Sequence, residues 1–311
     1  MTSTTSVSVL ALATALGASL FAAPAALAAD AIISGTVKDA AGAPMSGVTV
    51  SAKAQGSTIT TTVFTDEQGM YFFPALPAGP YRVRAQAVTF ETANANVAAD
   101  GKAKADFSMK PMKDFVKQLP GDIALAALPS ESPADAKMHR LVRSVCTSCH
   151  SASYVLQHKF DEDGWNKILT HMKQVNVYGI KVDRAPQAVI DYNQKELAAY
   201  LTKARGPGES SMKFDKMRPR PSGETARVVF KEYDVPTNPL AGLPDKTLTN
   251  DGSDWALGTP SGIGSTVHDA WVDTDGNIWF TSNIPNRVAS IVRINAQTGA
   301  DRKSTRLNSS H

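Results

Sequence analysis

The chain has 311 residues, of which 42% are hydrophobic and 20% charged, and its formal net charge is +3. This length predicts two or three domains, and the hydrophobic fraction is enough for them to bury cores. The nearly balanced charge, without a long basic block, argues against nucleic acid and against an anionic membrane surface as partners.

Residues 1–28 predict a signal peptide. The stretch from residue 7 to residue 28 is rich in Ala and free of charge, and Ala26-Leu27-Ala28 is a small-x-small cleavage site. No Lys or Arg precedes this stretch. A membrane-anchoring helix is the alternative interpretation. Its Ala, Gly and Ser make it less apolar than a Leu-rich span, which favours removal. We therefore expect a periplasmic or otherwise exported protein with no membrane span after signal removal.

Residues 30–112 predict a small antiparallel β-sandwich, because short runs of alternating apolar and β-branched residues are separated by Gly, Pro, Asp and Asn. The runs are Ile33–Val37, Val48–Ala52, Ile59–Phe64, Tyr71–Pro74 and Tyr81–Ala87. The segment contains neither Cys nor His, so nothing in it points to catalysis.

The amino-acid sequence of this segment resembles the carboxypeptidase regulatory-like domain. The resemblance rests on Gly35-Thr36-Val37, Gly42-Ala43-Pro44, Gly47-Val48-Thr49-Val50, Thr65–Phe73 and Leu76–Val83. It implies a transthyretin-like sandwich, with glycines and prolines that serve turn geometry. The implied role is that of a spacer or folding module, or the binding of a carbohydrate, another small-molecule ligand or a partner.

Residues 113–205 change to helical spacing and predict a small all-α domain. Ser132 and Pro133 are an expected helix start, Asp163 is an expected cap of a second helix, and Asn193 is expected to open the last helix. Gly206 follows its end. The inward residues of the second helix should be Trp165, Ile168, Leu169, Met172 and Val175, and those of the last helix Leu197, Tyr200 and Leu201.

The two cysteines of the chain lie in Cys146-Thr147-Ser148-Cys149-His150, which is C-x-x-C-H, the attachment sequence of c-type haem. On one helical turn the thiols of Cys146 and Cys149 can each add to a haem vinyl group, and His150 becomes the proximal iron ligand. A thioredoxin-type dithiol would need a βαβ context, and a zinc site a second Cys or His pair with suitable spacing. Neither is visible, so we expect one covalent haem c, in agreement with export.

The helices around this motif resemble the small cytochrome c domain. That family usually takes its distal ligand from a methionine between the attachment motif and the last helix, and Met172 is the methionine in that interval. The resemblance therefore implies Met172 as the distal iron ligand. Packing in the core is the alternative role for Met172, and His158 and His171 are alternative ligands. Gly164-Trp165 also fits some cytochrome domains.

Residues 206–226 predict a linker rich in Gly and Pro, and strands return over residues 227–300. Asp269–Thr281 predicts strand, Asp-Gly turn and strand, and Asn286–Ile294 predicts a further strand. This unit resembles one blade of the β-propellers related to streptogramin lyases (virginiamycin B lyase), and Val228–Asp234 is expected to be part of another blade.

Two weaker features lie in the same region. His268 precedes the blade strand where related propellers have a histidine, but the sequence is Val267-His268-Asp269 in place of Pro-His-Gly. The Gly-rich stretch 258–264 lacks the spacing of a phosphate-binding loop. Residues 301–311 resemble a translated sequencing adapter and are set aside. We expect the native protein to continue beyond Ala300, so that the propeller is partial and the chain a fragment.

The predicted fold is therefore multidomain: a transthyretin-like β-sandwich, an all-α cytochrome c domain and a truncated β-propeller. The predicted function is that of a periplasmic c-type cytochrome, with electron transfer to or from a redox partner protein or its own propeller. One alternative is a haem-containing propeller enzyme, either an oxidoreductase or streptogramin lyase-like. Another is a carbohydrate- or cell-wall-binding module. No catalytic residue can be named.

Overall fold

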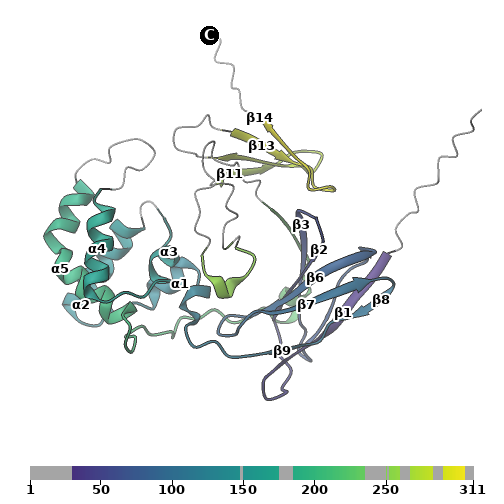
Figure 1. The fold of residues 1–311 in the computed structure, drawn as a ribbon, viewed down its shortest axis with the longest axis horizontal. Helices are drawn as coiled ribbons and strands as arrows, with labels where there is room; N and C mark the ends of the chain where they lie inside the picture. Colours follow the sequence, from purple (N-terminus) through teal and green to yellow (C-terminus); the bar gives the residue numbers. More distant parts are fainter. Residues whose placement is uncertain are drawn as a thin grey trace, which may run out of the picture.

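The computed structural model describes residues 30–147, 150–174, 185–234, 250, 252–259, 267–282 and 290–304. In Figure 1 the helices lie at the left, a β-sandwich at the right, and a separate C-terminal sheet above them. Among the described helices, none is both long and apolar enough to cross a membrane. The predicted signal peptide lies outside the described residues.

The N-terminal part is a β-sandwich of two sheets, as predicted, but its pairing is mixed. In the first sheet β1 pairs antiparallel with β4 and β5 and parallel with β8 and β9. The second sheet has the order β10-β3-β2-β6-β7 and is antiparallel. The strands are β1 (Asp30–Asp39), β2 (Thr49–Ala54), β3 (Ile59–Phe64), β4 (Met70–Phe72), β5 (Leu76–Pro77), β6 (Gly79–Gln86), β7 (Ala93–Ala99), β8 (Lys102–Lys104), β9 (Phe107–Met109) and β10 (Phe230–Tyr233).

The sandwich core follows from the alternation of its strands. Ile33, Val50 and Val83 are fully buried, as expected for residues that face the opposite sheet. The Tyr71 hydroxyl, buried in the same core, donates to the Ala105 carbonyl at 2.5 Å. Gly35 sits beside that carbonyl, and a Cβ at this position would lie 1.9 Å from its oxygen. A close approach of two backbones therefore requires glycine at position 35.

The helical part has its own core, in which Leu156, Trp165, Leu197 and Leu201 are among the fully buried side chains. Its elements are η1 (Phe115–Gln118), α1 (Gly121–Ala126), α2 (Pro133–Leu141), the π-helical turn η2 (Val142–Cys146), α3 (Ala152–Leu156), α4 (Glu162–Met172) and α5 (Ala185–Arg205). The predicted start of α2 is confirmed, because the Ser132 side chain accepts from the Asp135 backbone N–H at 3.0 Å.

Two predicted helix starts are wrong. Asp161, not Asp163, caps α4, and its carboxylate accepts from the Gly164 N–H at 2.8 Å. Asp163 falls in the first turn, where its charge favours the helix dipole. Helix α5 begins at Ala185, so Asn193 is internal. Its side-chain Nδ2 donates to the Val189 carbonyl one turn earlier at 2.9 Å, whereas its buried Oδ1 has no hydrogen-bond partner among the described residues.

Arg205, the last residue of α5, is buried with 1% of its surface exposed. Its guanidinium donates to both carboxylate oxygens of Asp114, at 3.0 and 3.3 Å. Burial alone would raise the pKa of Asp114, but the hydrogen bonds and charge of Arg205, with Lys159 and Lys117 nearby, lower it below its usual value. The pair is therefore ionised at neutral pH and joins α5 to the segment that enters the helical domain.

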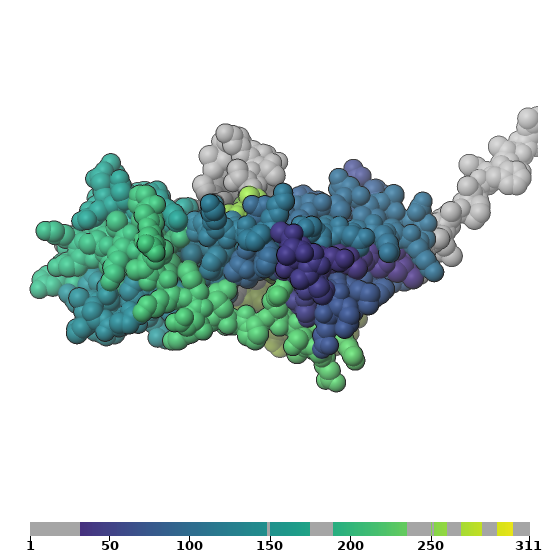
Figure 2. Space-filling view, turned by 90° about the horizontal axis from the view of Figure 1, so that it is seen from below, coloured from purple at the N-terminus to yellow at the C-terminus, as the bar shows by residue number. Residues whose placement is uncertain are grey.

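The predicted linker, residues 206–226, packs against both the helical core and the sandwich. The Lys213 N–H donates to the Ala127 carbonyl at 2.8 Å, and Met212 is buried in the helical core. Farther along, the backbone at Pro221 approaches Gly47 of the sandwich, and a short helix follows, η4 (Gly223–Arg227). In Figure 2 this green segment runs across the visible face from the helices toward the sandwich.

Strand β10 differs from the prediction. Val228–Asp234 is expected to be part of a propeller blade, but β10 pairs with β3 and extends the sandwich sheet. Phe230 packs edge-on against Phe64, with ring centroids 5.8 Å apart, and Lys53 forms an ion pair with Asp234 at 2.6 Å. The chain that leaves the helical domain is thus held to the sandwich.

The C-terminal sheet is a four-stranded antiparallel meander in sequence order: β11 (Val267–Val272), β12 (Ile278–Ser282), β13 (Ser290–Ile294) and β14 (Asp301–Ser304). The predicted Asp-Gly turn is confirmed, with Gly276 at φ 78 and the Asp273 carboxylate accepting from two backbone N–H groups of the turn. Residues 301–304, set aside in the prediction, form the fourth strand. Phe280, Val292 and Ile294 are buried on one face, against Tyr233.

We predict that Phe230→Ala exposes the β10 segment to protease. The change removes the ring contact with Phe64, which is worth about 0.5–1.5 kcal/mol beyond area burial. Limited trypsin digestion should therefore cut after Lys231 several-fold faster than in the unchanged protein. Phe72→Ala is the matched control, since Phe72 is also exposed and no ring contact joins it to another described residue. Equal cleavage rates in both variants would contradict the pairing of β10 with β3.

We predict that Asp114→Asn destabilises the helical domain by about 2 kcal/mol at neutral pH, because hydrogen bonds to charged groups contribute about 1.5–3 kcal/mol. The folded pKa of Asp114 is lowered, so its contribution is present above the unfolded pKa of about 3.9 and is lost as the pH falls through the folded pKa. Urea unfolding from pH 7 to pH 3 should show a shallower decline for the variant.

The control is Asp122→Asn, which breaks an exposed ion pair with Arg218. Exposed pairs contribute about 0–1 kcal/mol, so this variant should unfold nearly like the unchanged protein. An Asp114→Asn protein with unchanged stability and pH dependence would show that the buried pair does not stabilise the domain.

Candidate haem-attachment site

Cys146 is the last residue of η2, the turn that continues α2. It is half-buried and packs against the helical core beside Val142, which is fully buried. Burial raises the pKa of the Cys146 thiol to about 11. The thiol is therefore protonated at neutral pH, and its position at a helix end is fixed by the core beneath it. Ser148 and Cys149 lie outside the described residues.

His150 lies between η2 and α3 and is half-buried. Its Nδ1 lies 3.4 Å from the Ser151 carbonyl oxygen. With the proton on Nδ1, the imidazole donates a long hydrogen bond to this carbonyl and keeps its lone pair on Nε2. That is the usual arrangement of a metal-binding histidine, whose second nitrogen is oriented by a backbone carbonyl.

A row of rings leads from His150 into the helical core. The centroids of His150 and Tyr154 are 5.2 Å apart, those of Tyr154 and His158 6.2 Å, and those of His158 and Phe160 5.8 Å. Phe160 then meets buried Trp165 edge-on at 5.2 Å. These contacts fix His150 relative to α3 and α4. The row is not among the features expected from the sequence, although the i, i+4 spacing of His150, Tyr154 and His158 could have indicated it.

Met172 is the last residue of α4, and 36% of it is exposed. The predicted inward face holds for Trp165 and Leu169, which are buried, but not for Met172, so the alternative role of filling the core is wrong. Val175 lies outside the described residues. His158 and His171 are exposed. No hydrogen bond or ring contact joins Met172 to His150, two residues that the structure does describe.

The end of α4 lies beside exposed apolar side chains of α5. Lys173, which follows Met172, pairs with Asp191 of α5, and the neighbouring Val189 and Tyr192 are 37% and 83% exposed. The Lys137 ammonium of α2 lies 5.9 Å from the Tyr192 ring centroid. Helix α5 therefore contacts the end of α4 through Asp191 and α2 through Tyr192.

These features fit a haem group. Two thiols and an imidazole are the donor set that attaches haem c; Cys146 is held at the end of α2–η2, and His150 has an available Nε2. The partly buried Leu141 and Val145 precede Cys146 on the same helix. Within the described ranges, no group of three or more His, Cys, Asp or Glu side chains could hold a metal ion. His268 lies in β11, but its side chain is outside the described residues.

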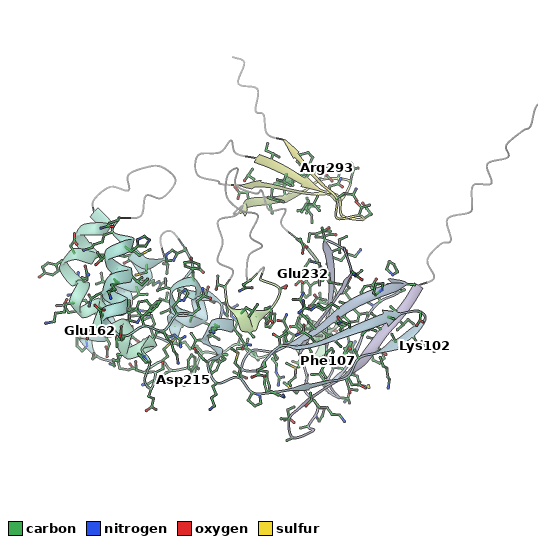
Figure 3. The ribbon with its side chains drawn as sticks, in the orientation of Figure 1. Lys102, Phe107, Glu162, Asp215, Glu232 and Arg293 are labelled. Carbon is green, nitrogen blue, oxygen red and sulfur yellow. The ribbon has the colours of Figure 1, made fainter. Side chains whose placement is uncertain are left out.

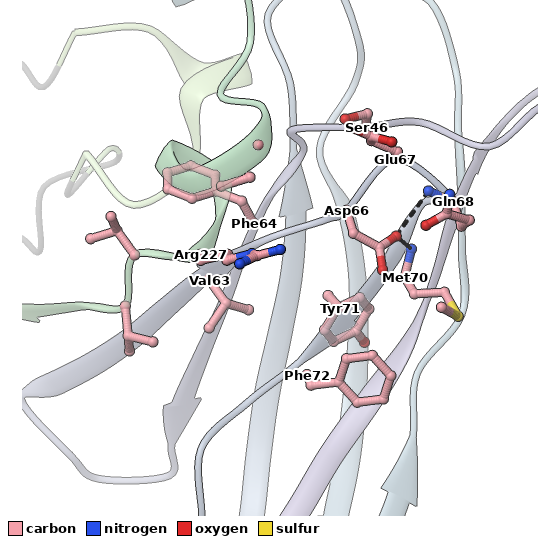
Figure 4. Close-up of a pocket in the computed structure, with 14 residues that line it drawn as sticks. Ser46, Val63, Phe64, Asp66, Glu67, Gln68, Met70, Tyr71, Phe72 and Arg227 are labelled. Atoms are coloured by element: carbon pink, nitrogen blue, oxygen red, sulfur yellow. Dashed lines mark hydrogen bonds between the residues drawn. The ribbon is translucent and has the colours of Figure 1, made fainter.

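Two pockets on the sandwich lie apart from the motif. One, of about 510 Å³, lies between the β3–β4 turn and residues 226–229. Figure 4 shows Phe64 beside Arg227, with Tyr71 and Phe72 across from them, and the Asp66 carboxylate accepting from the Gln68 and Met70 N–H groups. The second, of about 650 Å³, is lined by residues of β2, β6 and β7 in the second sheet and by the turn between β2 and β3. No feature of the sequence predicts either pocket.

Comparison with known proteins identifies the N-terminal domain. Residues 32–110 match the family profile of the carboxypeptidase regulatory-like domain, so this segment is a domain of that kind. The match confirms the resemblance seen in the sequence and the position of the sandwich. A search of curated proteins finds no match.

Among solved structures, the chain is similar to the Bacillus anthracis TIE protein (TM-score 0.23, 12% identity, 27% of this chain and 17% of that chain). It is similar to a Bacteroides uniformis protein assigned to carbohydrate binding (TM-score 0.23, 23% identity, 26% of this chain and 42% of that chain). It is also similar to 3-chlorocatechol 1,2-dioxygenase from Rhodococcus opacus (TM-score 0.22, 13% identity, 26% of this chain and 59% of that chain). The chain spans less than two thirds of each of these proteins.

We predict that Cys146 reacts slowly with iodoacetamide in the haem-free protein. The thiolate is the reactive form, and with a pKa of about 11 little of it exists at pH 8. In a Cys149→Ala variant, alkylation of Cys146 at pH 8 should be at least tenfold slower than in urea, where the pKa returns to about 8.5. Equal rates in folded and unfolded protein, measured by mass spectrometry, would show that the thiol is not buried.

Proposed function

We propose that this protein is an exported c-type cytochrome that carries one haem c and transfers single electrons. The observation that carries the proposal is the sequence Cys146-Thr147-Ser148-Cys149-His150 at the end of a helix that packs on a small all-α core. When bound, the haem would supply a one-electron redox centre. Cys146 and Cys149 would form the thioethers.

His150 would bind the iron through Nε2. Its long hydrogen bond to the Ser151 carbonyl and its contact with the Tyr154 ring would hold the imidazole in one orientation, which limits rearrangement when the charge of the site changes. Met172 would supply the distal thioether. Its exposure at the end of α4 supports a role outside the core, and a thioether ligand favours the ferrous state.

We further propose that the C-terminal sheet is one blade of a β-propeller. A blade is a four-stranded antiparallel sheet, and β11 to β14 form such a sheet in sequence order. The electron partner of the haem domain would be either this propeller or a redox protein in the periplasm.

We predict that protein made with a cytochrome c maturation system shows a haem spectrum that persists after acid–acetone extraction. Replacing both thiols, Cys146→Ala with Cys149→Ala, should abolish the persistent spectrum, because no thioether can form. Thr147→Ala is the matched control, since it changes the motif at a position without haem chemistry, and it should leave the spectrum intact. Colourless protein from a working maturation system would contradict the proposal.

We predict that Met172→Ala lowers the reduction potential of the matured protein by on the order of 0.1 V, because axial ligands set haem potentials over a range of about 0.8 V. The low-spin spectrum should change as well. Met70→Ala is the control, because Met70 is 38% exposed on the sandwich and should leave both unchanged. If Met172→Ala also leaves the spectrum and potential unchanged, Met172 is not the ligand.

A further inference from the structure

The pocket of about 510 Å³ lies at an edge of the sandwich. Strand β4 is an end strand of the first sheet in the order β4-β1-β5, and β10 is an end strand of the second sheet. The lining comes from Ser46, the end of β3, the β3–β4 turn, β4, η4 and the two residues that follow η4. The volume lies in the range of organic ligand sites, about 300–1000 Å³.

Most of this lining is apolar. Phe72, Val228 and Val229 are 61%, 44% and 48% exposed. Single exposed apolar side chains are ordinary on a protein surface, but these three line one concavity. The hydroxyl of buried Tyr71 donates to the Ala105 carbonyl, so Tyr71 offers the pocket only its ring. The pocket therefore presents an apolar surface to a ligand.

Three charged side chains belong to the same lining. Arg227, the last residue of η4, lies beside Phe64, whereas Asp66 and Glu67 come from the β3–β4 turn (Figure 4). The Asp66 Oδ1 accepts from two backbone N–H groups of the turn, which leaves its Oδ2. Among the described residues, neither the Arg227 guanidinium nor the Glu67 carboxylate has a hydrogen bond or an ion pair.

We propose that this pocket binds a zwitterion with an apolar side chain, that is, an apolar α-amino acid or a short peptide of such residues. The carboxylate would pair with Arg227, because a guanidinium matches two carboxylate oxygens with parallel N–H donors. The ammonium would lie at Asp66 Oδ2 and Glu67. The side chain would contact the exposed ring of Phe72 and the two valines.

A ligand with a single charge fits this lining less well. A plain anion that approached Arg227 would also meet the two carboxylates of the turn, and a plain cation at the turn would meet Arg227, and like charges repel. A neutral polar ligand would leave the exposed apolar side chains without a contact. This inference goes beyond the proposed function and does not depend on haem, because no residue of the lining belongs to the C-x-x-C-H segment or to the helical core.

The test is isothermal titration calorimetry of the full chain with probes that differ in one feature each. L-Leucine carries both charges and an apolar side chain. N-Acetyl-L-leucine lacks the ammonium, L-leucinamide lacks the carboxylate, and L-serine lacks the apolar side chain. We expect saturable binding of L-leucine at millimolar concentration and binding at least about fivefold weaker for each of the other three, because each loses one contact.

The dipeptide L-leucyl-L-leucine distinguishes the two sources of this chemistry. Tighter binding of the dipeptide than of L-leucine would assign the pocket to the ends of peptides, and the reverse would assign it to free amino acids.

The variants Arg227→Gln and Glu67→Gln each remove one charge. Both side chains are exposed, so both variants should fold, which circular dichroism checks, and each should weaken the binding of L-leucine at least about fivefold. In Arg227→Gln, L-leucinamide should bind as well as L-leucine, because the carboxylate has lost its partner. Lys102→Gln on β8 and Glu162→Gln on α4 are the matched controls, away from the pocket (Figure 3), and should leave binding unchanged.

Three results would each overturn the proposal. The first is no binding of either L-leucine or the dipeptide at millimolar concentration. The second is equal affinity for L-leucine and for N-acetyl-L-leucine or L-leucinamide in the unchanged protein. The third is a folded Arg227→Gln protein that binds L-leucine with unchanged affinity.

Discussion

Arg205 joins the parts of the helical domain at the end of α5. Besides its pair with Asp114, its guanidinium donates to the carbonyls of Gln157 and His158, where α3 ends, at 3.3 Å each. Its own carbonyl accepts from the Trp165 indole N–H of α4 at 3.2 Å. Burying a cation is expensive unless it is paired and its N–H groups are satisfied. The Arg205 side chain and backbone carbonyl therefore connect α5 with the end of α3, with α4 and with Asp114, which precedes the first helices. These contacts fix the helices that carry Cys146 and His150.

This frame supports the proposed haem site. Haem attachment needs two thiols and an imidazole at set positions, and a helix end that frays would not provide them. The core under η2 holds Cys146, and the rings from Tyr154 to Trp165 hold His150. In the proposed function these two residues would hold the haem, and the exposed thioether of Met172 would be a third donor.

Local rules predicted much of the fold. Alternation indicated most strands of the sandwich, and Ser132 was identifiable as a cap, because these signals depend on neighbouring residues alone. Asp161 and Asp163 are both acids near one helix start, so sequence could not decide which side chain reaches the Gly164 N–H. The pairing of β10 with β3, across about 170 residues, and the pair of Arg205 with Asp114 depend on tertiary contacts that no local pattern shows. The cysteine motif was evident, but the ring row beside it needed the assembled structure.

The measurement that tests the central claim most directly is the intact mass of the exported, matured protein under denaturing conditions. A mass increased by one haem, located by peptide mapping on the fragment that contains Cys146 and Cys149, is the result that this account predicts. A mass equal to that of the bare polypeptide, or smaller by the two hydrogens of a Cys146–Cys149 disulfide, would contradict it.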